Sequence, residues 1–368
     1  MEYIIIGNGV AGTEAAKAIR RNDNLSEIKI FSQDHYPFYS RPRLPELLAK
    51  EVNTEDIFVR NYEWYNKNKI QSFLNCTVKH IDPKNQKITL KDKSCFTYSK
   101  LLLATGSSSA LPPIDGINTP EGIFTLRTVE DALTITKRAS LTRTATLIGG
   151  GLLGLEAGNG RKKLGLSLTN IEFFDRLLPR QLDGDGESSV ILKKNGRNEF
   201  KISPRSSIKI GKRIWSYKNC RTKNGNIVES NFILVSAGIK PNITLAQAAG
   251  IAVNKGIIVN DRMETNITNV YAAGYVAEYN GRMYGIWPAA QRQGVIAGIN
   301  MSGGKEVYKG TVPSTTLKVA GIHLTSMGDI AAEDKTTEQI KVTDPSKNIY
   351  KKLFLKDGKI VGATTYGK

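Results

Sequence analysis

One pattern occurs twice in this chain and constrains the fold more than any other feature: a β-branched run, a GxGxxG turn and a stretch suited to a helix. The first copy spans residues 3–20 (YIIIGNGVAGTEAAKAIR) and the second spans residues 146–162 (TLIGGGLLGLEAGNGRK). In such a unit the first glycine makes a tight turn, the second admits a pyrophosphate, and the third lets the helix pack on the strand. The sequence therefore predicts two dinucleotide-binding units.

The stretches that follow each copy support the same architecture. A further strand is predicted at residues 28–31 (IKIF) after the first copy and at 168–174 (LTNIEFF) after the second. Residues 100–112 (KLLLATGSSSALP) and 232–242 (FILVSAGIKPN) each read as a buried strand that ends in a small-residue turn with glycine. This is the order expected of a doubly wound α/β fold whose strands return past a ligand.

An acidic residue indicates which nicotinamide nucleotide the second copy binds. Glu172 lies 18 residues beyond Gly154, where a carboxylate accepts hydrogen bonds from an adenosine ribose. A 2′-phosphate would be repelled there, and Phe173 and Phe174 supply no arginine to bind one. The pattern favours NADH over NADPH.

Length and hydropathy limit the class of protein. At 368 residues the chain is about two to three times the length of a typical domain, so more than one domain is expected. No apolar run approaches the roughly 18 residues that a membrane span needs. The N-terminus lacks a basic segment ahead of its apolar run, which does not fit a secretory signal, so a cytoplasmic protein without membrane spans is predicted.

Charge and cysteine content limit the partners. Lys and Arg outnumber Asp and Glu by 52 to 34, which gives a net charge of +18 and favours acidic partners. The basic residues are spread along the chain, with no block longer than 161–163 and no recognisable nucleic-acid-binding module, so no specific nucleic acid is predicted. Cys76, Cys95 and Cys220 form no CxxC or CxxxxC pair, so neither a metal site nor a redox-active disulfide is predicted.

Nine motifs carry a resemblance to a known family. The chain resembles the FAD- and NAD(P)H-dependent pyridine nucleotide oxidoreductases, most of all the branch of NADH:rubredoxin oxidoreductases and the flavin domains of assimilatory nitrite reductases. The motifs are GNGVAGTEAA, YPFYSRPRLPELL, LLLATGS, IFTLRTVEDA, LIGGGLLGLEA, IEFFDRLLPRQLD, LVSAGIKPN, METNITNVYAAG and GIWPAAQRQGVIAGINM.

The resemblance implies three domains. They are a discontinuous FAD-binding domain at 1–110 and 242–308, an NADH-binding domain at 111–241, and a small α+β interface domain at 309–368. The last domain is predicted to be rich in strands, with a hairpin turn at Asp357-Gly358. Its role as an interface leaves both a monomer and a homodimer open.

The resemblance also assigns the residues that bind FAD. Arg41 would approach the diphosphate, Gln33 or Asp34 would meet the adenosine ribose, and Trp287 and Pro288 open a helix facing the flavin's pyrimidine edge. The remaining candidates are Gly7, Gly9, Val10, Ala11 and Gly12 for the pyrophosphate, Val78 for the adenine, Ala104, Thr105 and Gly106 for the turn over the cofactor, Arg127 near the isoalloxazine, and Tyr275.

A second group of residues is assigned to NADH and to catalysis. Glu156 corresponds to the family acid beside the flavin and nicotinamide rings, and Arg43 is the second catalytic candidate, although Arg41 and Arg43 also fit a solvated surface. The NADH candidates are Gly149, Gly151, Leu152 and Gly154 for the phosphates, Glu172 for the ribose and Gly238 for the nicotinamide side.

Two departures from the family pattern affect ligand binding. Tyr275 replaces an aspartate that accepts a hydrogen bond from the FAD ribitol, a loss on the order of 1.5–3 kcal/mol. We therefore expect FAD to bind, tenfold to a hundredfold more weakly, with the Tyr275 ring turned aside. The segment Gly158-Asn159-Gly160 weakens the helix of the second unit, because each glycine costs roughly 1 kcal/mol relative to alanine.

The absence of cysteine near the expected flavin position favours one mechanism. Disulfide reductases and the related NADH oxidases and peroxidases carry cysteine there, whereas residues 38–45 (FYSRPRLP) contain none. The resemblance then implies hydride transfer from NADH to FAD and delivery of electrons to a small acidic carrier of the rubredoxin or ferredoxin type. A nucleotide-binding scaffold or sensor with weak or no turnover, a ferredoxin- or nitrite-type reductase component, and an NADH oxidase remain alternatives.

Overall fold

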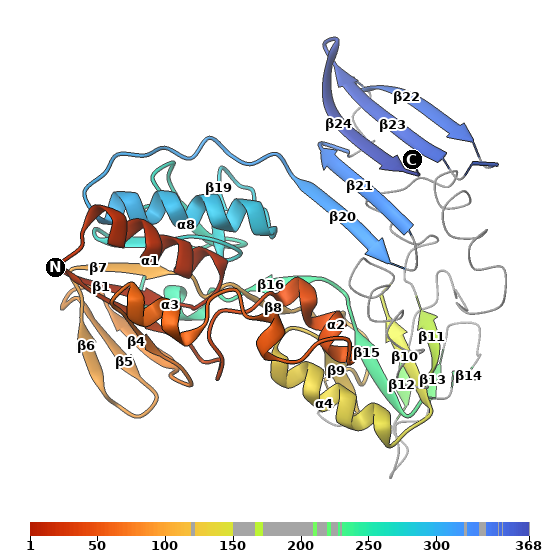
Figure 1. Cartoon of the computed structure of the whole chain (residues 1–368), viewed down its shortest axis with the longest axis horizontal. Helices are drawn as coiled ribbons and strands as arrows, with labels where there is room; N and C mark the ends of the chain where they lie inside the picture. The colour runs from red at the N-terminus through yellow and green to blue at the C-terminus, as the bar shows by residue number, and fades with distance from the viewer. Residues whose placement is uncertain are drawn as a thin grey trace. The chain divides into compact units, whose positions relative to one another are not determined.

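A computed structural model describes most of the chain (Figure 1). The described residues are 1–118, 122–149, 166–171, 209–211, 219–221, 227–228, 230–319, 322–330, 336–344, 346–347 and 349–367. Their contacts divide the chain into two compact units. The first unit comprises Met1–Ser40, Glu55–Ser108 and Ile239–Thr311, and the second comprises Arg41–Thr54, Ser109–Gly238 and Val312–Lys368.

The core of the first unit is a parallel five-stranded sheet in the order β18-β7-β1-β2-β3. The strands are β1 (Glu2–Ile6), β2 (Glu27–Phe31), β3 (Ile70–Phe73), β7 (Lys100–Leu103) and β18 (Val270–Ala272). Apolar residues fill β1 and β7 almost continuously, as in a parallel sheet covered on both faces. The strands predicted at 28–31 and near 100 are confirmed.

Two helices distant in sequence pack side by side in this unit: α1 (Val10–Asn22) and α8 (Trp287–Met301) (Figure 1). Their backbones approach closely because glycines line the contact. A Cβ atom built on Gly294 would lie 2.3 Å from the carbonyl oxygen of Ala11, and one on Gly298 would lie 2.4 Å from that of Ala15. Only glycine is compatible with this spacing, so the small residues of both helices set their separation.

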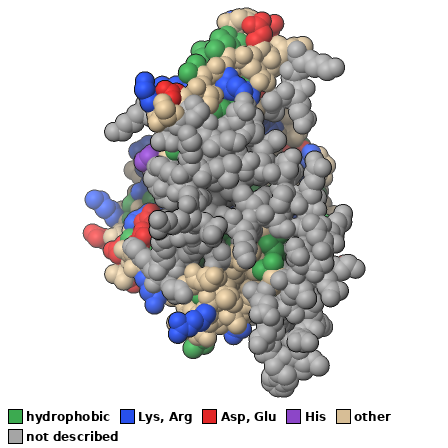
Figure 2. All heavy atoms as spheres, turned by 90° about the vertical axis from the view of Figure 1, so that its right-hand side faces the viewer, with side chains coloured by type: hydrophobic (Ala, Val, Ile, Leu, Met, Phe, Trp, Pro, Cys, Tyr) green, Lys and Arg blue, Asp and Glu red, His purple; other side chains and the backbone are tan. Residues whose placement is uncertain are grey.

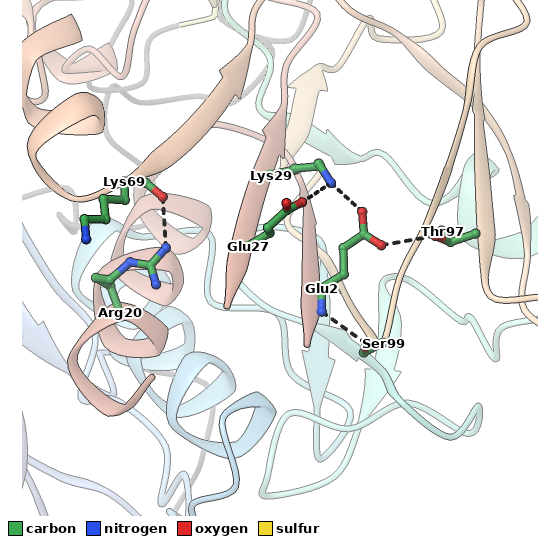
Figure 3. Close-up of polar contacts among 7 residues, drawn as sticks. All are labelled: Glu2, Arg20, Glu27, Lys29, Lys69, Thr97 and Ser99. Atoms are coloured by element: carbon green, nitrogen blue, oxygen red, sulfur yellow. Dashed lines mark hydrogen bonds and ion pairs between the residues drawn. The ribbon is translucent and has the colours of Figure 1, made fainter. Parts of the chain in front are cut away.

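Polar side chains fix the ends of α1 and of the first two strands (Figure 3). The Arg20 guanidinium donates to four carbonyl oxygens at 2.8–3.0 Å, joining the end of α1 to the loop before β2 and to the residues before β3. Lys29 on β2 pairs with Glu2 and with Glu27, the latter at 2.6 Å, and Glu2 also accepts from Thr97 at 3.1 Å. These contacts stabilise the register of β1 against β2.

Smaller elements complete the first unit. An antiparallel sheet joins β4 (Val78–Asp82), β5 (Lys87–Leu90) and β6 (Cys95–Thr97), while β17 (Ile257–Val259) pairs with β19 (Ala277–Tyr279). Short helical segments are η2 (Glu55–Ile57), α3 (Tyr62–Lys67) and α7 (Thr244–Ala248). Strand β8 (Ser107–Ser109) pairs with β16 (Ile239–Pro241).

The second unit contains a parallel sheet in the order β11-β10-β15-β9. Its strands are β9 (Ile123–Thr125), β10 (Thr144–Ile148), β11 (Ser167–Ile171) and β15 (Phe232–Val235). Helix α4 (Val129–Ser140) packs against α2 (Leu44–Leu48), which follows η1 (Arg41–Arg43). A small sheet joins β12 (Lys209–Gly211), β13 (Asn219–Arg221) and β14 (Ile227–Val228).

The C-terminal part of the second unit is an antiparallel sheet in the order β20-β21-β24-β23-β22. The strands are β20 (Ser314–Val319), β21 (Ile322–Gly328), β22 (Glu338–Asp344), β23 (Ile349–Lys356) and β24 (Lys359–Tyr366). Asp357 and Gly358 have φ values of +52° and +69°, as a two-residue hairpin turn requires. The predicted hairpin at these residues is confirmed.

Candidate functional site

The first glycine turn joins β1 to α1 and touches the end of β7. Gly7 has φ +117°, its N–H donates to the Phe31 carbonyl at 2.8 Å, and the Ala104 N–H donates to the Ile6 carbonyl at 2.8 Å. A Cβ atom on Gly7 would lie 2.0 Å from the Ala104 carbonyl oxygen. The turn therefore depends on glycine both for its backbone angle and for its close approach to β7.

The start of α1 continues this turn. Gly9 is the N-cap, no side chain caps the helix, and no acidic residue lies in the first turn. The N–H groups at such an end lack acceptors within the helix and carry a partial positive charge. A Cβ atom on Gly12 would lie 2.0 Å from the Gly7 carbonyl oxygen, so this glycine too is required for the turn to close. Val10 and Ala11 lie in the first turn of the helix.

A second loop approaches the same helix end from the C-terminal part of the unit. Gly274 has φ +89°, and a Cβ atom on it would lie 2.9 Å from the Ala11 Cβ. The buried Gln293 on α8 accepts the Gly274 N–H at 2.9 Å and holds this loop in place. Tyr275 follows directly and packs, half-buried, against the core. The loop bearing Tyr275 is therefore adjacent to the first turn of α1.

The turn after β7 is clasped by one asparagine. Thr105 Oγ1 donates to the Asn242 carbonyl at 3.0 Å, Asn242 Nδ2 donates to the Thr105 carbonyl at 2.9 Å, and the Asn242 N–H donates to the Gly106 carbonyl at 3.0 Å. Gly106 has φ +66°. Ala104, Thr105 and Gly106, three of the predicted site residues, thus form one fixed turn beside Gly7.

Of the two residues predicted for the adenosine ribose, Asp34 has a fixed carboxylate and Gln33 is exposed. Tyr39 donates its hydroxyl to Asp34 Oδ2 at 3.2 Å, and the Asp34 N–H donates to Ser32 Oγ at 3.2 Å. Val78 opens β4 and is 8% exposed.

The predicted start of a helix at Trp287 and Pro288 is confirmed, since α8 begins at Trp287 with proline in its first turn. The Trp287 ring lies 5.5 Å from that of Phe38, centroid to centroid. The Phe38 N–H donates to the Tyr65 hydroxyl at 3.1 Å, and that hydroxyl donates to Asn8 Oδ1 at 2.8 Å. Burial raises the pKa of Tyr65 to about 12.

Three arginines predicted for the site lie in the second unit. Arg41 and Arg43 form η1, where Arg43 pairs with Glu46 at 2.9 Å. The Arg127 N–H donates to Asp131 Oδ2 at 2.8 Å. Asp131 also accepts the Thr128 N–H and Thr128 Oγ1 accepts the Asp131 N–H, which makes a capping box at the start of α4. The motif LRTVED therefore has a local structural role, because its capping box fixes the backbone of Arg127.

The second glycine turn repeats the first where the structure describes it. Gly149 has φ +110°, its N–H donates to the Ile171 carbonyl at 3.0 Å, and the Ser236 N–H donates to the Ile148 carbonyl at 2.8 Å. A Cβ atom on Gly149 would lie 2.3 Å from the Ser236 carbonyl oxygen. Gly238 has φ +101°. The other predicted residues of this site, namely Gly151, Leu152, Gly154, Glu156 and Glu172, and the segment 158–160, lie outside the described residues.

Several residues around the first turn were missed from the sequence: Asn8, Tyr39, Tyr65 and Gln293. Asn8 could have been singled out from the sequence because it stands between two glycines of the motif. Gln293 could have been singled out because it precedes Gly294 in the helix. Nothing in the sequence connected Tyr65 to residue 8, since their contact depends on how α3 packs.

The first turn has the features that an anionic dinucleotide needs. Gly7, Gly12 and Gly274 allow close approaches of the backbone that any side chain would block, and the start of α1 has no side-chain cap and no acidic residue in its first turn. Phosphate groups bind well at such helix ends. The residues present therefore fit the pyrophosphate of a dinucleotide cofactor.

Comparison with known families identifies the class. Residues 1–294 match the model of pyridine nucleotide-disulphide oxidoreductases, and residues 313–368 match that of the rubredoxin NAD+ reductase C-terminal domain. The chain belongs to the pyridine nucleotide-disulphide oxidoreductase family, which confirms the predicted family and fold class.

Individual members of the family show which proteins the chain is similar to. The chain is 34% identical to the NADH-rubredoxin oxidoreductase of Clostridium acetobutylicum, covering 100% of this chain and 91% of the relative. The crystal structure of that enzyme superposes with a TM-score of 0.84 at 33% identity, covering 100% of this chain and 91% of that one.

A longer relative is equally similar. The chain is 34% identical to the assimilatory nitrate reductase electron transfer subunit of Bacillus subtilis (strain 168), covering 99% of this chain. The chain spans about half the length of this relative, 47%. None of the helices in the described ranges is both long and apolar enough to cross a membrane.

Proposed function

We propose that the chain is an NADH-dependent FAD oxidoreductase that passes electrons to a small acidic carrier of the rubredoxin or ferredoxin type. The observation that carries the proposal is the matched pair of glycine turns at Gly7 and Gly149, each pressed against the end of a neighbouring parallel strand. Two such turns in one chain favour two dinucleotides. When bound, NADH supplies a hydride, and FAD accepts it and gives up electrons singly.

In the first unit, backbone groups would hold FAD. Gly7, Gly9, Val10, Ala11 and Gly12 would surround the pyrophosphate, with N–H donors at the start of α1. The Asp34 carboxylate, fixed by Tyr39, is favoured over the exposed Gln33 for the adenosine ribose.

Other residues would orient the flavin. Trp287 and Pro288 begin α8, whose N-terminal partial charge suits the electron-rich pyrimidine edge of a reduced flavin. Tyr275 would leave the ribitol without its usual charged acceptor. The remaining proposed contacts are the backbone at Val78 for the adenine, Ala104, Thr105 and Gly106 over the cofactor, Arg41 for the diphosphate and Arg127 for the isoalloxazine.

The second unit would bind NADH and supply the catalytic groups. Gly149, Gly151, Leu152 and Gly154 are proposed for the phosphates, Glu172 for the ribose, Gly238 for the nicotinamide side, and Glu156 and Arg43 for catalysis. The proposal for NADH draws support from the left-handed backbone of Gly149 and Gly238, since both turns sit at the carboxyl ends of strands β10 and β15.

The acceptor is proposed from charge and from chemistry. Residues 38–45 contain no cysteine to relay electrons through a thiol, so electrons would leave directly to an external carrier. The net charge of +18 would steer an acidic protein. On the face drawn in Figure 2, Lys and Arg side chains are dispersed over the described residues, so the attraction would act at long range.

The three domains at 1–110 with 242–308, at 111–241 and at 309–368 are retained as a proposal, with the first assigned to FAD and the second to NADH. A monomer and a homodimer remain open, and a cytoplasmic location remains a prediction.

Anaerobic stopped-flow spectroscopy tests the proposed function. After loading with FAD, rapid bleaching near 450 nm on mixing with NADH is the expected result for any flavin reduced by hydride. Binding without bleaching would favour the scaffold or sensor that Tyr275 leaves as the second candidate. A protein that stays colourless in excess FAD would overturn the proposed enzyme.

Parallel assays of rubredoxin, ferredoxin and oxygen then distinguish the acceptors. Fast reduction of rubredoxin or of ferredoxin supports the proposal, a preference for ferredoxin pointing to a nitrite-type reductase component, whereas preference for oxygen points to an NADH oxidase.

A further inference from the structure

A buried phenol contacts the middle of the first glycine turn. Asn8, the residue between Gly7 and Gly9, is 9% exposed, and its Oδ1 accepts the hydroxyl of Tyr65 at 2.8 Å. Tyr65 is 1% exposed, and its hydroxyl oxygen accepts the N–H of Phe38 at 3.1 Å. A single hydroxyl therefore joins the turn to a segment thirty residues further along the chain.

The direction of these hydrogen bonds is fixed by chemistry. The Phe38 N–H can only donate, so it occupies a lone pair of the phenol oxygen, and the phenol proton goes to Asn8 Oδ1. Asn8 Nδ2 is buried and has no partner among the described residues. In that part of the chain the Asn8 side chain is thus held only by Tyr65.

Tyr65 is itself rigidly placed. It lies on α3, whose N-cap Asn61 accepts the Trp64 N–H at 3.0 Å, and its ring packs in the main core with the Trp64 ring edge-on at 5.1 Å. Burial raises its pKa to about 12, so the hydroxyl remains a neutral donor at physiological pH. A fixed donor on a packed helix is suited to set the position of a flexible glycine loop.

We propose that Tyr65 is a positioning residue for the FAD pyrophosphate. Its hydroxyl holds the Asn8 side chain and thereby the backbone N–H groups on either side of Asn8. The same hydroxyl accepts the N–H of Phe38, whose ring contacts Trp287 at the start of α8. The inference rests on the proposed function, because it takes the first turn as the pyrophosphate site. It deepens that proposal by assigning a role to Tyr65, a residue that would act on the cofactor indirectly, through Asn8.

The test compares two buried phenols of the same unit. Tyr65→Phe removes the hydroxyl that holds Asn8, whereas Tyr98→Phe removes one that is equally buried and has no partner among the described residues. Dissociation constants of the apoprotein for FAD and for ADP are measured by calorimetry, with folding checked by circular dichroism. We expect Tyr65→Phe to weaken both ligands about tenfold, because both carry the pyrophosphate, and Tyr98→Phe to stay within about twofold.

A second variant keeps the result interpretable if Tyr65→Phe folds poorly. Asn8→Ala should weaken FAD and ADP by a similar factor, and the double variant should be no weaker than the worse single variant, because both remove the same link. Unchanged affinities in Tyr65→Phe, or additive losses in the double variant, would overturn the proposal even if the melting temperature falls.

Ligand binding by the wild-type protein distinguishes failure of the proposed function from failure of the positioning role of Tyr65. If it binds ADP and not FAD, the proposed function fails; a loss of ADP affinity in Tyr65→Phe would then still support the positioning role at the first turn, and an unchanged ADP affinity would overturn it. If it binds neither ligand, the first turn is no pyrophosphate site and both proposals are overturned.

Discussion

The two glycine turns of this chain have the same backbone and different surroundings. Gly7 and Gly149 have φ values of +117° and +110°, and in each turn the N–H donates to the end of the next strand at 2.8 or 3.0 Å. Each would clash with a neighbouring carbonyl oxygen if it carried a Cβ atom, that of Ala104 in the first case and that of Ser236 in the second.

The two turns differ in how the backbone is held after the neighbouring strand, which is β7 for the first turn and β15 for the second. After β7 the residues Thr105 and Gly106 are clasped by the side chain and backbone of Asn242, whereas after β15 the Gly238 carbonyl accepts the backbone N–H of Ala110 at 2.9 Å. The comparison teaches that the two turns share a glycine of positive φ placed between parallel strands, to which the first turn adds Gly12. The described side chains and backbone around the turns are where they differ.

The largest expected effect comes from adding one methyl group to either turn. Gly7→Ala should weaken FAD binding at least about 100-fold and leave NADH binding within about threefold, while Gly149→Ala should do the reverse, because each Cβ atom would overlap a backbone oxygen that cannot move cheaply. Flavin content after purification and titration with NADH measure the two effects.

Retention of the other ligand serves as the folding control in each variant. Loss of both ligands in Gly7→Ala with a cooperative unfolding transition intact would contradict the separation of the two sites.

The next largest effect is expected at Tyr275, which lies beside the first turn of α1. Tyr275→Asp should tighten FAD binding about tenfold to a hundredfold, because a carboxylate beside the start of α1 supplies a charged acceptor. Fluorescence quenching of FAD by apoprotein gives the dissociation constants. Tyr275→Phe is the control, and equal affinity in Tyr275→Asp and Tyr275→Phe would show that this position does not meet the cofactor.

Alkaline pH should affect the first unit in particular. Tyr3, Tyr65, Tyr98 and Tyr308 all lie in it, and burial raises the pKa of each to about 12 from 10.0. A raised pKa stabilises the folded state fully below pH 10, and this stabilisation is lost as pH rises from 10 to 12.

For Tyr65 alone the loss is on the order of 1–3 kcal/mol. Urea unfolding at pH 9, 10 and 11 measures it, and Tyr65→Phe should reduce the pH dependence. An identical pH dependence in that variant would contradict the assignment to Tyr65.

The smallest expected effect is confined to the second unit. Thr128→Ala removes half of the capping box at α4 and should lower the free energy of unfolding by about 1 kcal/mol. Affinity for FAD should change less than about twofold, because the Asp131 carboxylate that accepts the Arg127 N–H is kept. Thr128→Ser, which keeps the hydroxyl, is the matched control in the same urea titrations, and an equal loss in both variants would argue against the cap.

Local chemistry made the main elements predictable. Strands β1, β2, β7, β10 and β15, the helix from Val10, the helix from Trp287 and the hairpin at Asp357 follow from apolar runs, glycine spacing, proline and turn residues that act within a few positions of the chain. Contacts between distant segments were not predictable. The Tyr65–Asn8 and Gln293–Gly274 hydrogen bonds span 57 and 19 residues and depend on how helices pack on the sheet.

The candidate site divides in the same way. Its glycines were predictable because each answers a backbone requirement that a motif records. The preference for Asp34 over Gln33 in our proposal was not, since the two residues are neighbours in the sequence and differ in their exposure and in the contact of Asp34 with the Tyr39 hydroxyl. The pairing of Arg43 with Glu46 likewise needed the geometry of η1, because three residues of sequence separation fit a contact only when the backbone turns helically.

The glycine-lined contact between α1 and α8 has a consequence for biosynthesis. A ribosome delivers α1 almost at once, yet its packing partner at Gly294 and Gly298 emerges some 280 residues later, after all four parallel strands of the second sheet, which end at Val235. Because domains fold as their residues become available, the parallel sheet of the second unit can form before the unit that begins the polypeptide closes its core. Nascent chains arrested before residue 290 should accordingly expose α1 to a protease.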